Sequence, residues 1–218
     1  MESLPDGGYG CRFAPLRPRR VESAIKRALD LVSALALIVL LLPVFVVVAI
    51  AVRVDSPGPI FFGQARVGRD LRVFRMWKFR TMHDGADMER PVADPGNQSF
   101  PLVKLVHDPR TTRVGRVLRR WSIDEAPQLW NVIRGDMSLV GPRPRLPREV
   151  LADGLRQSLR LGVRPGATGP WQVNGRADLP YAEGVALDLG YVRNWSLLTD
   201  LRFLARTPWA IVSGRGAY

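Results

Sequence analysis

Two adjacent acidic residues, Asp124 and Glu125, are the side chains best suited to chemistry in this sequence. They lie among arginines, with Arg119 five residues before Asp124 and a Pro-Arg-Pro segment at 142–144. One carboxylate can attack a phosphorus centre while its neighbour holds a divalent metal against the phosphate oxygens. Arginine and lysine supply donors that neutralise a diphosphate. The pattern therefore indicates phosphoryl transfer as one interpretation.

The same pair also has a purely structural interpretation. Residues 122–125 (Ser-Ile-Asp-Glu) fit a capping box, in which Ser122 and Glu125 satisfy backbone N–H groups at a helix start. Acidic side chains in a first helical turn also interact favourably with the helix dipole. The residues alone leave both interpretations open.

Missing motifs exclude several classes of enzyme. The chain has no Gly-x4-Gly-Lys-Ser/Thr phosphate loop, no Gly-x-Gly-x-x-Gly fingerprint and no Gly-x-Ser-x-Gly motif. Cys11 is the single cysteine, so the chain cannot build an internal disulfide framework or a cysteine-rich zinc site. ATPase, dinucleotide-dependent and serine-hydrolase chemistry are therefore excluded.

The net charge of +12 calls for an anionic partner. The 218 residues, enough for one domain with a sizeable core, include 32 basic and 20 acidic side chains. Nucleic acid, an anionic membrane surface and a phosphorylated substrate are the candidates. Of the basic residues 29 are Arg, which suits bidentate phosphate recognition but also follows from high-GC codon usage.

A long apolar segment indicates contact with a membrane. Residues 31–52 carry no charge, and roughly 20 apolar residues suffice to cross a bilayer as a helix. A signal peptide is disfavoured, because its apolar region spans only about 7 to 15 residues. Pro43 lies just past the middle of the segment, where it removes a backbone hydrogen bond.

Two arrangements of this segment are compatible with the sequence. Basic residues lie on both sides of it, which by the positive-inside rule places both of its ends at the cytoplasmic face. The 12 residues before Pro43 rise only about 18 Å, less than the roughly 30 Å hydrocarbon core. A re-entrant helix broken at Pro43 satisfies both observations. A kinked single span is the alternative, since membrane helices tolerate proline.

The rest of the chain is expected to be a helix-rich α/β mixture. Residues 60–62 and 71–79 predict a short β-hairpin around Gly68. Two segments punctuated by glycine and proline, 139–147 and 164–176, are predicted to be loops.

Three helices are predicted from the spacing of apolar residues. The first covers residues 111–120, and the second covers 124–133 and ends at Gly135. The third covers residues 200–213, is interrupted by Pro208 and has the pattern of a helix lying in a membrane interface.

Five segments resemble the bacterial sugar transferases, the monotopic phosphoglycosyl transferases that act on polyprenyl phosphate. The resemblance extends from about residue 25 to the C-terminus, and the third segment is specific by itself. The segments are KRALDLVSALALIVLLLP (26–43), GRDLRVFRMWKFRTM (68–82), DPRTTRVGRVLRRWSIDEAPQLWNVIRGDMSLVGPRP (108–144), RPGATGPWQVNGR (164–176) and YVRNWSLLTDL (191–201).

The resemblance implies a role for each matching residue. Asp124 would attack the phosphate that bears the sugar, and Glu125 would bind Mg²⁺. Lys78 and Arg119 would be phosphate ligands. The substrate-binding residues that meet the nucleotide would be Pro142, Arg143, Pro144, Gln172 and Arg176.

The resemblance also implies a reaction and a place. The enzyme would transfer a sugar-1-phosphate from a UDP-sugar to polyprenyl (undecaprenyl) phosphate through a covalent aspartyl-phosphosugar, release UMP and start cell-surface glycan or exopolysaccharide assembly. It would lie in the cytoplasmic membrane through a re-entrant helix-break-helix, with its catalytic domain on the cytoplasmic face. The implied partners are the UDP-sugar, the polyprenyl phosphate and the lipid bilayer, without nucleic acid. The sugar, the glycan and the oligomeric state, monomer or homodimer, stay open.

These expectations divide the chain into three parts: a mobile basic tail (1–24), a re-entrant membrane helix (25–54) and a cytosolic phosphoglycosyl transferase domain (55–218). The polar stretch 83–103 matches no motif of the family. Two other functions compete. The charge and six Trp suggest a membrane-tethered nucleic-acid binder, and a non-catalytic lipid-binding scaffold could keep the same fold.

Overall fold

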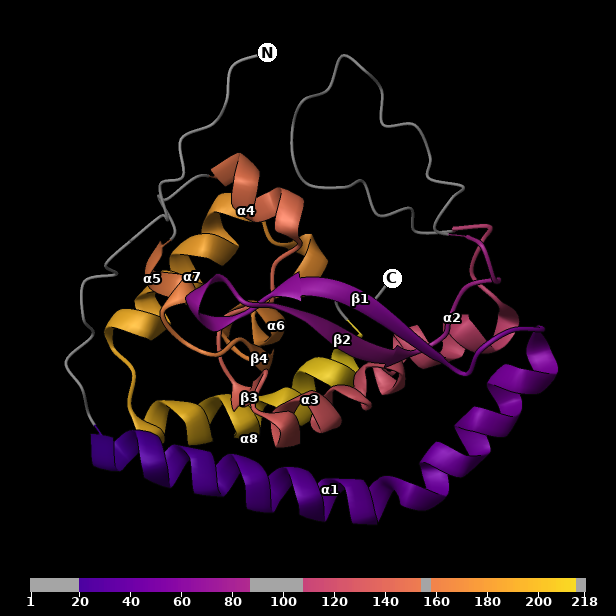
Figure 1. The fold of residues 1–218 in the computed structure, drawn as a ribbon, viewed down its shortest axis with the longest axis horizontal. Helices are drawn as coiled ribbons and strands as arrows, with labels where there is room; N and C mark the ends of the chain where they lie inside the picture. Colours follow the sequence, from indigo (N-terminus) through magenta and orange to yellow (C-terminus); the bar gives the residue numbers. More distant parts are fainter. Residues whose placement is uncertain (1–19, 87–107, 154–157, 215–218) are drawn as a thin grey trace, which may run out of the picture.

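The computed structural model describes residues 20–86, 108–153 and 158–214. One long helix, α1 (Arg20–Asp55), runs along one side of the molecule, and the sheets and the other helices lie on the opposite side of it (Figure 1). The architecture is a helix-rich α/β mixture, as expected. Most of the predicted tail and of the stretch 83–103 lies outside the described residues.

The break predicted at Pro43 is not seen. Helix α1 is 36 residues long and continues through Pro43 without ending there, although Figure 1 shows that it is bent. A proline removes one backbone hydrogen bond and kinks a helix without necessarily ending it. The helix also begins at Arg20, so the last residues of the predicted tail are helical.

Helix α1 is attached to the rest of the protein by polar side chains near its start. Lys26 Nζ donates to Asp200 Oδ2 at 2.6 Å, and Asp30 Oδ1 accepts the N–H of Leu139 at 3.0 Å. Arg27 bonds to the C=O of Val132. Most large apolar side chains of α1 stay exposed, so much of this helix presents hydrocarbon to its surroundings.

The predicted hairpin is confirmed. Strands β1 (Phe61–Val67) and β2 (Val73–Phe79) pair antiparallel, and the short helix η1 (Arg69–Leu71) follows Gly68 at the tip. The register places Lys78 opposite Phe62. Met76 and Phe79, on β2, enter two separate apolar clusters, which fix the strand that carries Lys78.

The first predicted helix is confirmed and the second is corrected. Helix α2 covers Arg113–Arg120, and the Thr112 side chain caps it by accepting the N–H of Gly115. The segment predicted as one helix over 124–133 is divided into the 3₁₀ helix η2 (Ile123–Glu125) and helix α3 (Gln128–Arg134). Pro127 stands between them and has no N–H to continue the ladder. Gly135 ends α3 at a φ of 87°, as predicted.

A second small sheet joins the two segments predicted as loops. Strands β3 (Ser138–Val140) and β4 (Gly166–Thr168) pair in parallel. Their backbones approach so closely that a Cβ on Gly141 or Gly166 would meet the backbone of the facing segment. The glycines that suggest loops in the sequence are therefore required for strand contact.

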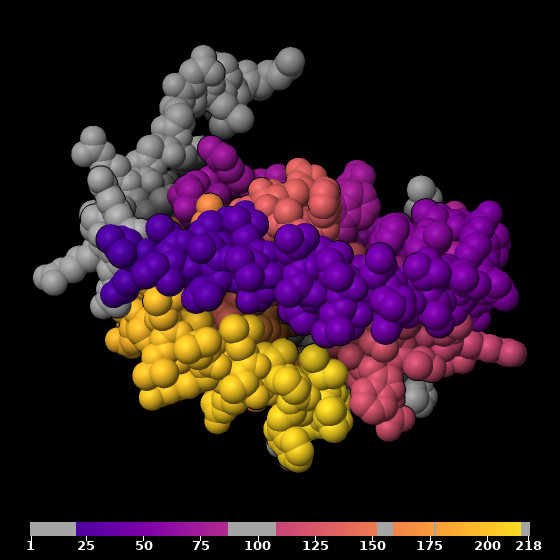
Figure 2. Space-filling model, turned by 90° about the horizontal axis from the view of Figure 1, so that it is seen from below, coloured from indigo at the N-terminus to yellow at the C-terminus, as the bar shows by residue number. Residues whose placement is uncertain are grey.

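The remaining helices lie on the same side of α1 as the two sheets, and the last of them in the chain is the one beside α1 (Figure 1). They are α4 (Pro147–Asp153), α5 (Ser158–Leu161), α6 (Pro170–Val173), η4 (Arg176–Asp178), α7 (Tyr181–Arg193) and α8 (Leu197–Ser213). Helix α8 starts slightly before the prediction and continues through Pro208. Figure 2 shows α8 beside α1 on one face of the molecule, and its Leu201 and Trp209 are exposed.

Candidate active site

The acidic pair lies on η2, between α2 and α3, and does not form the capping box. Ser122 has a φ of 55°, in the left-handed region, and its side chain makes no cap hydrogen bond. Its hydroxyl instead accepts a hydrogen bond from Arg176 Nη1 at 2.7 Å. Asp124 is buried, with 6% of its surface exposed, whereas the side chain of Glu125 is 42% exposed. The capping box that the structural interpretation requires is therefore not formed.

Lys78 connects the hairpin to both carboxylates. Its Nζ donates to Glu125 Oε1 at 2.6 Å and lies 3.8 Å from Asp124 Oδ2. The ammonium is thus bonded to Glu125 and only near Asp124. Of the two ion pairs that Lys78 makes, the one with Asp124 is therefore the longer and weaker.

The two carboxylates have opposite pKa shifts. Burial, and to a lesser degree the charge of Glu125, raise the pKa of Asp124 to about 6 against the pull of Lys78. Burial alone would raise the pKa of Glu125, but the charge and hydrogen bond of Lys78 outweigh it, with help from Arg143 and Arg176, and lower it. The pair therefore combines a buried, proton-sensitive carboxyl with an ionised, partly exposed one.

Arg119 lies beside Asp124 and is held by two threonines. Its Nε donates to Thr81 Oγ1 at 2.9 Å, and its Nη1 donates to Thr111 Oγ1 at 3.4 Å. Gly115 lets α2 approach closely, because a Cβ there would meet the backbone of Thr81. The charge of Arg119 in turn lowers the pKa of Asp124. Sequence reasoning missed both threonines, although Thr81 belongs to the segment that contains Lys78.

Arg143 lies in the Pro-Arg-Pro loop that follows β3. The C=O of Pro142 accepts the N–H of Gly166 at 2.9 Å, and the C=O of Pro144 accepts Arg66 Nη1 at 3.0 Å. The guanidinium of Arg143 lies 5.5 Å from the ring centroid of Trp171. Because its charge also lowers the pKa of Glu125, this loop belongs electrostatically to the site.

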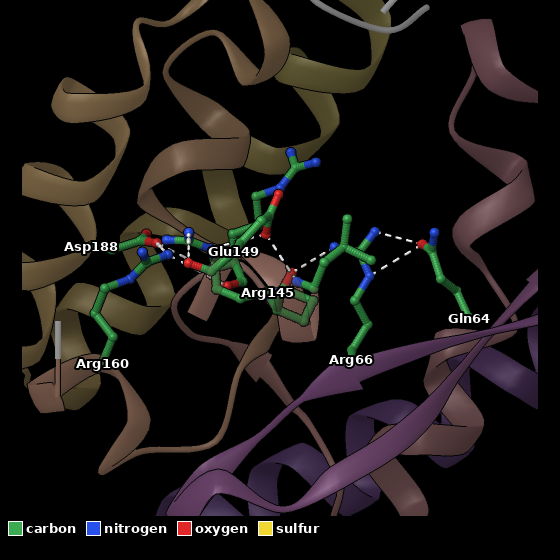
Figure 3. A network of polar contacts seen from close by, with 9 residues as sticks. Gln64, Arg66, Arg145, Glu149, Arg160 and Asp188 are labelled. Atoms are coloured by element: carbon green, nitrogen blue, oxygen red, sulfur yellow. Dashed lines mark hydrogen bonds and ion pairs between the residues drawn. The ribbon is translucent and has the colours of Figure 1, made fainter. Parts of the chain in front are cut away.

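Arg66 is a cation near the site that sequence reasoning did not single out. It is buried on β1, and its two bonds to Gln64 and its bond to the 142–144 loop are part of the network in Figure 3. Burial, together with the charge of Arg143, lowers its pKa to about 10. Its proximity to the site follows from its hydrogen bond to the 142–144 loop and could not be inferred from the sequence.

Arg176 connects the last predicted loop to the dyad, whereas Gln172 is turned into the loop itself. Besides its bond to Ser122, Arg176 offers its C=O to Trp171 Nε1 at 2.7 Å. The amide of Gln172 donates to the C=O of Gly166 at 3.5 Å, and its Oε1 is buried without a hydrogen-bond partner in the described structure. The charges of Lys78, Arg119, Arg143 and Arg176 thus act on the pKa values of the dyad, while the nucleotide-binding role predicted for Gln172 stays a prediction.

A magnesium ion fits this site only with help from substrate. Within the described ranges, no group of three or more His, Cys, Asp or Glu side chains could hold a metal ion. Glu125 is half-exposed, and Lys78 bonds to its Oε1. Magnesium is commonly held by one or two carboxylates together with substrate phosphates, so a single accessible carboxylate beside a phosphate site suits it.

Comparisons with known proteins agree with the geometry. The sequence profile of a family described as bacterial sugar transferase matches residues 21–214. The chain is 41% identical over 208 residues to the exopolysaccharide production protein ExoY of Sinorhizobium fredii, covering 92% of this chain and 91% of that protein. It is 40% identical over 212 residues to the UDP-glucose:undecaprenyl-phosphate glucose-1-phosphate transferase of Caulobacter vibrioides, covering 92% of this chain and 74% of that one.

Some relatives are longer. The UDP-galactose-lipid carrier transferase of Erwinia amylovora is 42% identical over 202 residues, which are 89% of this chain but 42% of that protein. The chain thus spans less than half the length of this relative.

Proposed function

The chain belongs to the bacterial sugar transferase family, and from this premise we propose that it transfers a sugar-1-phosphate from a UDP-sugar to polyprenyl phosphate, releases UMP and starts exopolysaccharide assembly. The names of relatives that match most of their own length and of this chain support the donor, the acceptor and the pathway. The observation that carries the proposal is the buried Asp124, which lies beside an ionised Glu125 and within the electrostatic influence of the cations Lys78 and Arg119.

The reaction proceeds in two displacements at one phosphorus atom. In the first, an Asp124 oxygen attacks the phosphorus that bears the sugar, the bond to the UMP oxygen breaks, and UMP leaves with that electron pair. In the second, a phosphate oxygen of the polyprenyl carrier attacks the same phosphorus and Asp124 leaves as a carboxylate. Two steps let a soluble donor and a membrane-held acceptor use one site in turn.

The cations around the dyad bind and orient the phosphates. In this mechanism Lys78 and Arg119, whose charges lower the pKa of Asp124, bind the phosphate oxygens, and Arg143 and Arg176, whose charges lower the pKa of Glu125, bind the nucleotide side of the donor. Glu125 would hold Mg²⁺, which when bound supplies further charge neutralisation at the diphosphate. Gln172 supports the loop that carries Arg176 in this account.

Helix α1 serves as a re-entrant element that enters and leaves at the cytoplasmic face of the membrane. It is the helix, among those described, that is long and apolar enough to cross a bilayer. Its bend, its exposed apolar side chains and the basic residues on both flanks support a shallow course. Such a course keeps the site at the headgroup level, where the acceptor phosphate lies.

Labelling from one side of the membrane tests this course. Val21 and Val54 are exposed near the two ends of α1, and Cys11, the only native thiol, can be replaced by Ser. We expect Val21→Cys and Val54→Cys to react with an impermeant maleimide from the same face of oriented vesicles. Reaction from opposite faces would establish the kinked span instead.

Trapping the intermediate tests the chemistry. The full chain, incubated with Mg²⁺ and a panel of UDP-sugars without acceptor, should release about one equivalent of UMP and gain a phosphosugar mass on Asp124. Asp124→Asn should lose both signals, with a fall in turnover of at least about 10³-fold, while still binding membranes. Normal turnover without any adduct would overturn the covalent route, and salt-sensitive nucleic-acid binding without UMP release would support the competing function.

A further inference from the structure

Both peptide groups of Arg143 are bonded to one buried ion pair. The N–H of Arg143 donates to Asp188 Oδ2 at 3.1 Å, and its C=O accepts a hydrogen bond from Arg160 Nη2 at 3.4 Å. Arg160, on α5, and Asp188, on α7, are themselves paired (Figure 3). Asp188 has no exposed surface and Arg160 has 5%. The pair therefore fixes the backbone of Arg143, a residue that binds the donor in our proposal.

The Pro-Arg-Pro sequence leaves one backbone N–H in this segment for such a hydrogen bond. Pro142 and Pro144 have no N–H, so Arg143 carries the only backbone donor of the three residues. Asp188 occupies that donor, and the C=O groups of the two prolines are taken by Gly166 and Arg66. No other backbone donor within the segment can fix the direction of the Arg143 side chain.

The same face of α7 also places the ring on which Arg143 lies. Gly184 precedes Asp188 by four residues, about one helical turn, so both lie on one face of α7. A Cβ at Gly184 would collide with the ring of Trp171. That ring lies 5.5 Å from the Arg143 guanidinium and donates its N–H to Arg176. One helix face thus orients both the backbone and the side chain of Arg143.

Stability alone does not account for this pair. Burial raises the pKa of Asp188 and lowers the pKa of Arg160, because each loses hydration when charged. Asp188 Oδ1 is buried without a hydrogen-bond partner in the described part of the chain. Buried ion pairs can commonly be replaced by apolar residues of similar volume without loss of stability.

We propose that Asp188 and Arg160 are positioning residues that hold Arg143 toward the dyad and the donor nucleotide. This inference rests on the proposed function, since the donor is what Arg143 is held to meet. It adds two residues, from α5 and α7, to those that determine how tightly the UDP-sugar binds.

An apolar replacement of the pair separates positioning from stability. The double variant Asp188→Leu with Arg160→Met removes both charges and both bonds to Arg143 but fills the space. With the full chain in membranes, we expect a KM for the UDP-sugar raised about tenfold, a kcat within about twofold and an unchanged unfolding temperature. A folded double variant with an unchanged KM would overturn the inference.

A second cycle keeps the test valid if the double variant does not fold. Arg160→Lys keeps a cation, but its shorter side chain ends before the position of Arg160 Nη2, the nitrogen that bonds to both Asp188 Oδ2 and the C=O of Arg143. It should raise the KM about threefold in the wild-type background and not at all when combined with Arg143→Ala. Equal effects in both backgrounds would overturn the inference alone. Absence of UMP release from the unaltered chain with every UDP-sugar would overturn the proposed function, and the inference with it.

Discussion

Asp124 and Asp188 are both buried aspartates whose pKa burial raises, yet their surroundings differ. Asp188 forms a direct ion pair with Arg160 and accepts the N–H of Arg143. Asp124 has its nearest lysine nitrogen at 3.8 Å, because Lys78 bonds to Glu125 instead. The same side chain therefore has a direct ion-pair partner in one region and, in the other, only a longer pair with a lysine that is bonded to Glu125.

The difference indicates that burying an incompletely paired carboxylate for reaction lowers the free energy of unfolding. A buried carboxylate with only a weak ion pair destabilises the folded state when it is ionised, whereas a directly paired buried carboxylate becomes most costly when its partner is removed. We accordingly assign the chemistry to the η2 turn and the positioning to the cluster on α7. Measurements of stability, of its pH dependence, of the pH profile of the reaction and of the KM for the donor test this contrast.

The largest expected effect is a pair of stability changes of opposite sign. Asp188→Asn leaves Arg160 buried without its counter-charge and should lower the free energy of unfolding by about 3 kcal/mol. Asp124→Asn removes a poorly compensated buried charge and should raise it by about 1 to 3 kcal/mol at pH 7.5. Thermal unfolding of the detergent-solubilised chain measures both.

The pH dependence of this stability gain has a defined sign. The folded pKa of Asp124, about 6, lies above its ordinary value of 3.8, so the folded state binds the proton more tightly. The contribution of this group is complete below about pH 4 and is lost as the pH rises through 6. The advantage of Asp124→Asn should therefore vanish near pH 4. An advantage that persists there would show that the gain does not come from the charge.

A smaller effect is expected in the pH profile of the reaction. The nucleophile must be ionised, so kcat/KM should fall about tenfold per unit as the pH drops below about 6. Lys78→Met removes a cation that lowers the pKa of Asp124, and should move this acid limb to higher pH as well as reduce the rate. UMP release between pH 4.5 and 8.5 measures the limb. A limb that stays in place in Lys78→Met would contradict the assignment to Asp124.

The smallest effect concerns the bond between the dyad turn and the donor loop. Ser122→Ala removes the oxygen that Arg176 Nη1 contacts, and should raise the KM for the UDP-sugar about threefold. Ser122→Gly also removes it but suits the φ of 55° better, so it should show the same KM with higher stability. Ser196→Ala, which removes the cap of α8, serves as the control and should lower stability without changing the KM.

Local sequence patterns predicted the hairpin, helix α2 and the stop at Gly135, because turn glycines, caps and apolar spacing act within a few residues. The same reasoning failed at Ser122, which has a left-handed backbone and whose hydroxyl is bonded to Arg176, 54 residues further along the chain. It also missed β3 and β4, because strands of three residues that pair across the chain have no period of their own.

The candidate site shows the same division. Asp124, Glu125, Lys78 and Arg119 follow from the sequence through their types and their resemblance to a family, while Arg66, Thr81 and Trp171 become visible only through contacts. The position of Asp188, one turn after Gly184 in a helix, could have indicated a buried residue. Nothing near it in the chain predicts its hydrogen bond to Arg143.

Residue type and hydrophobic length are properties of the chain, so the sequence was enough to single out the candidate side chains and the long apolar segment that accompanies them. The fold was needed to show which aspartate is directly paired and which one, in our proposal, reacts. That choice depends on distances of a few ångströms between residues far apart in sequence, and burial makes the electrostatic energy steep over those distances.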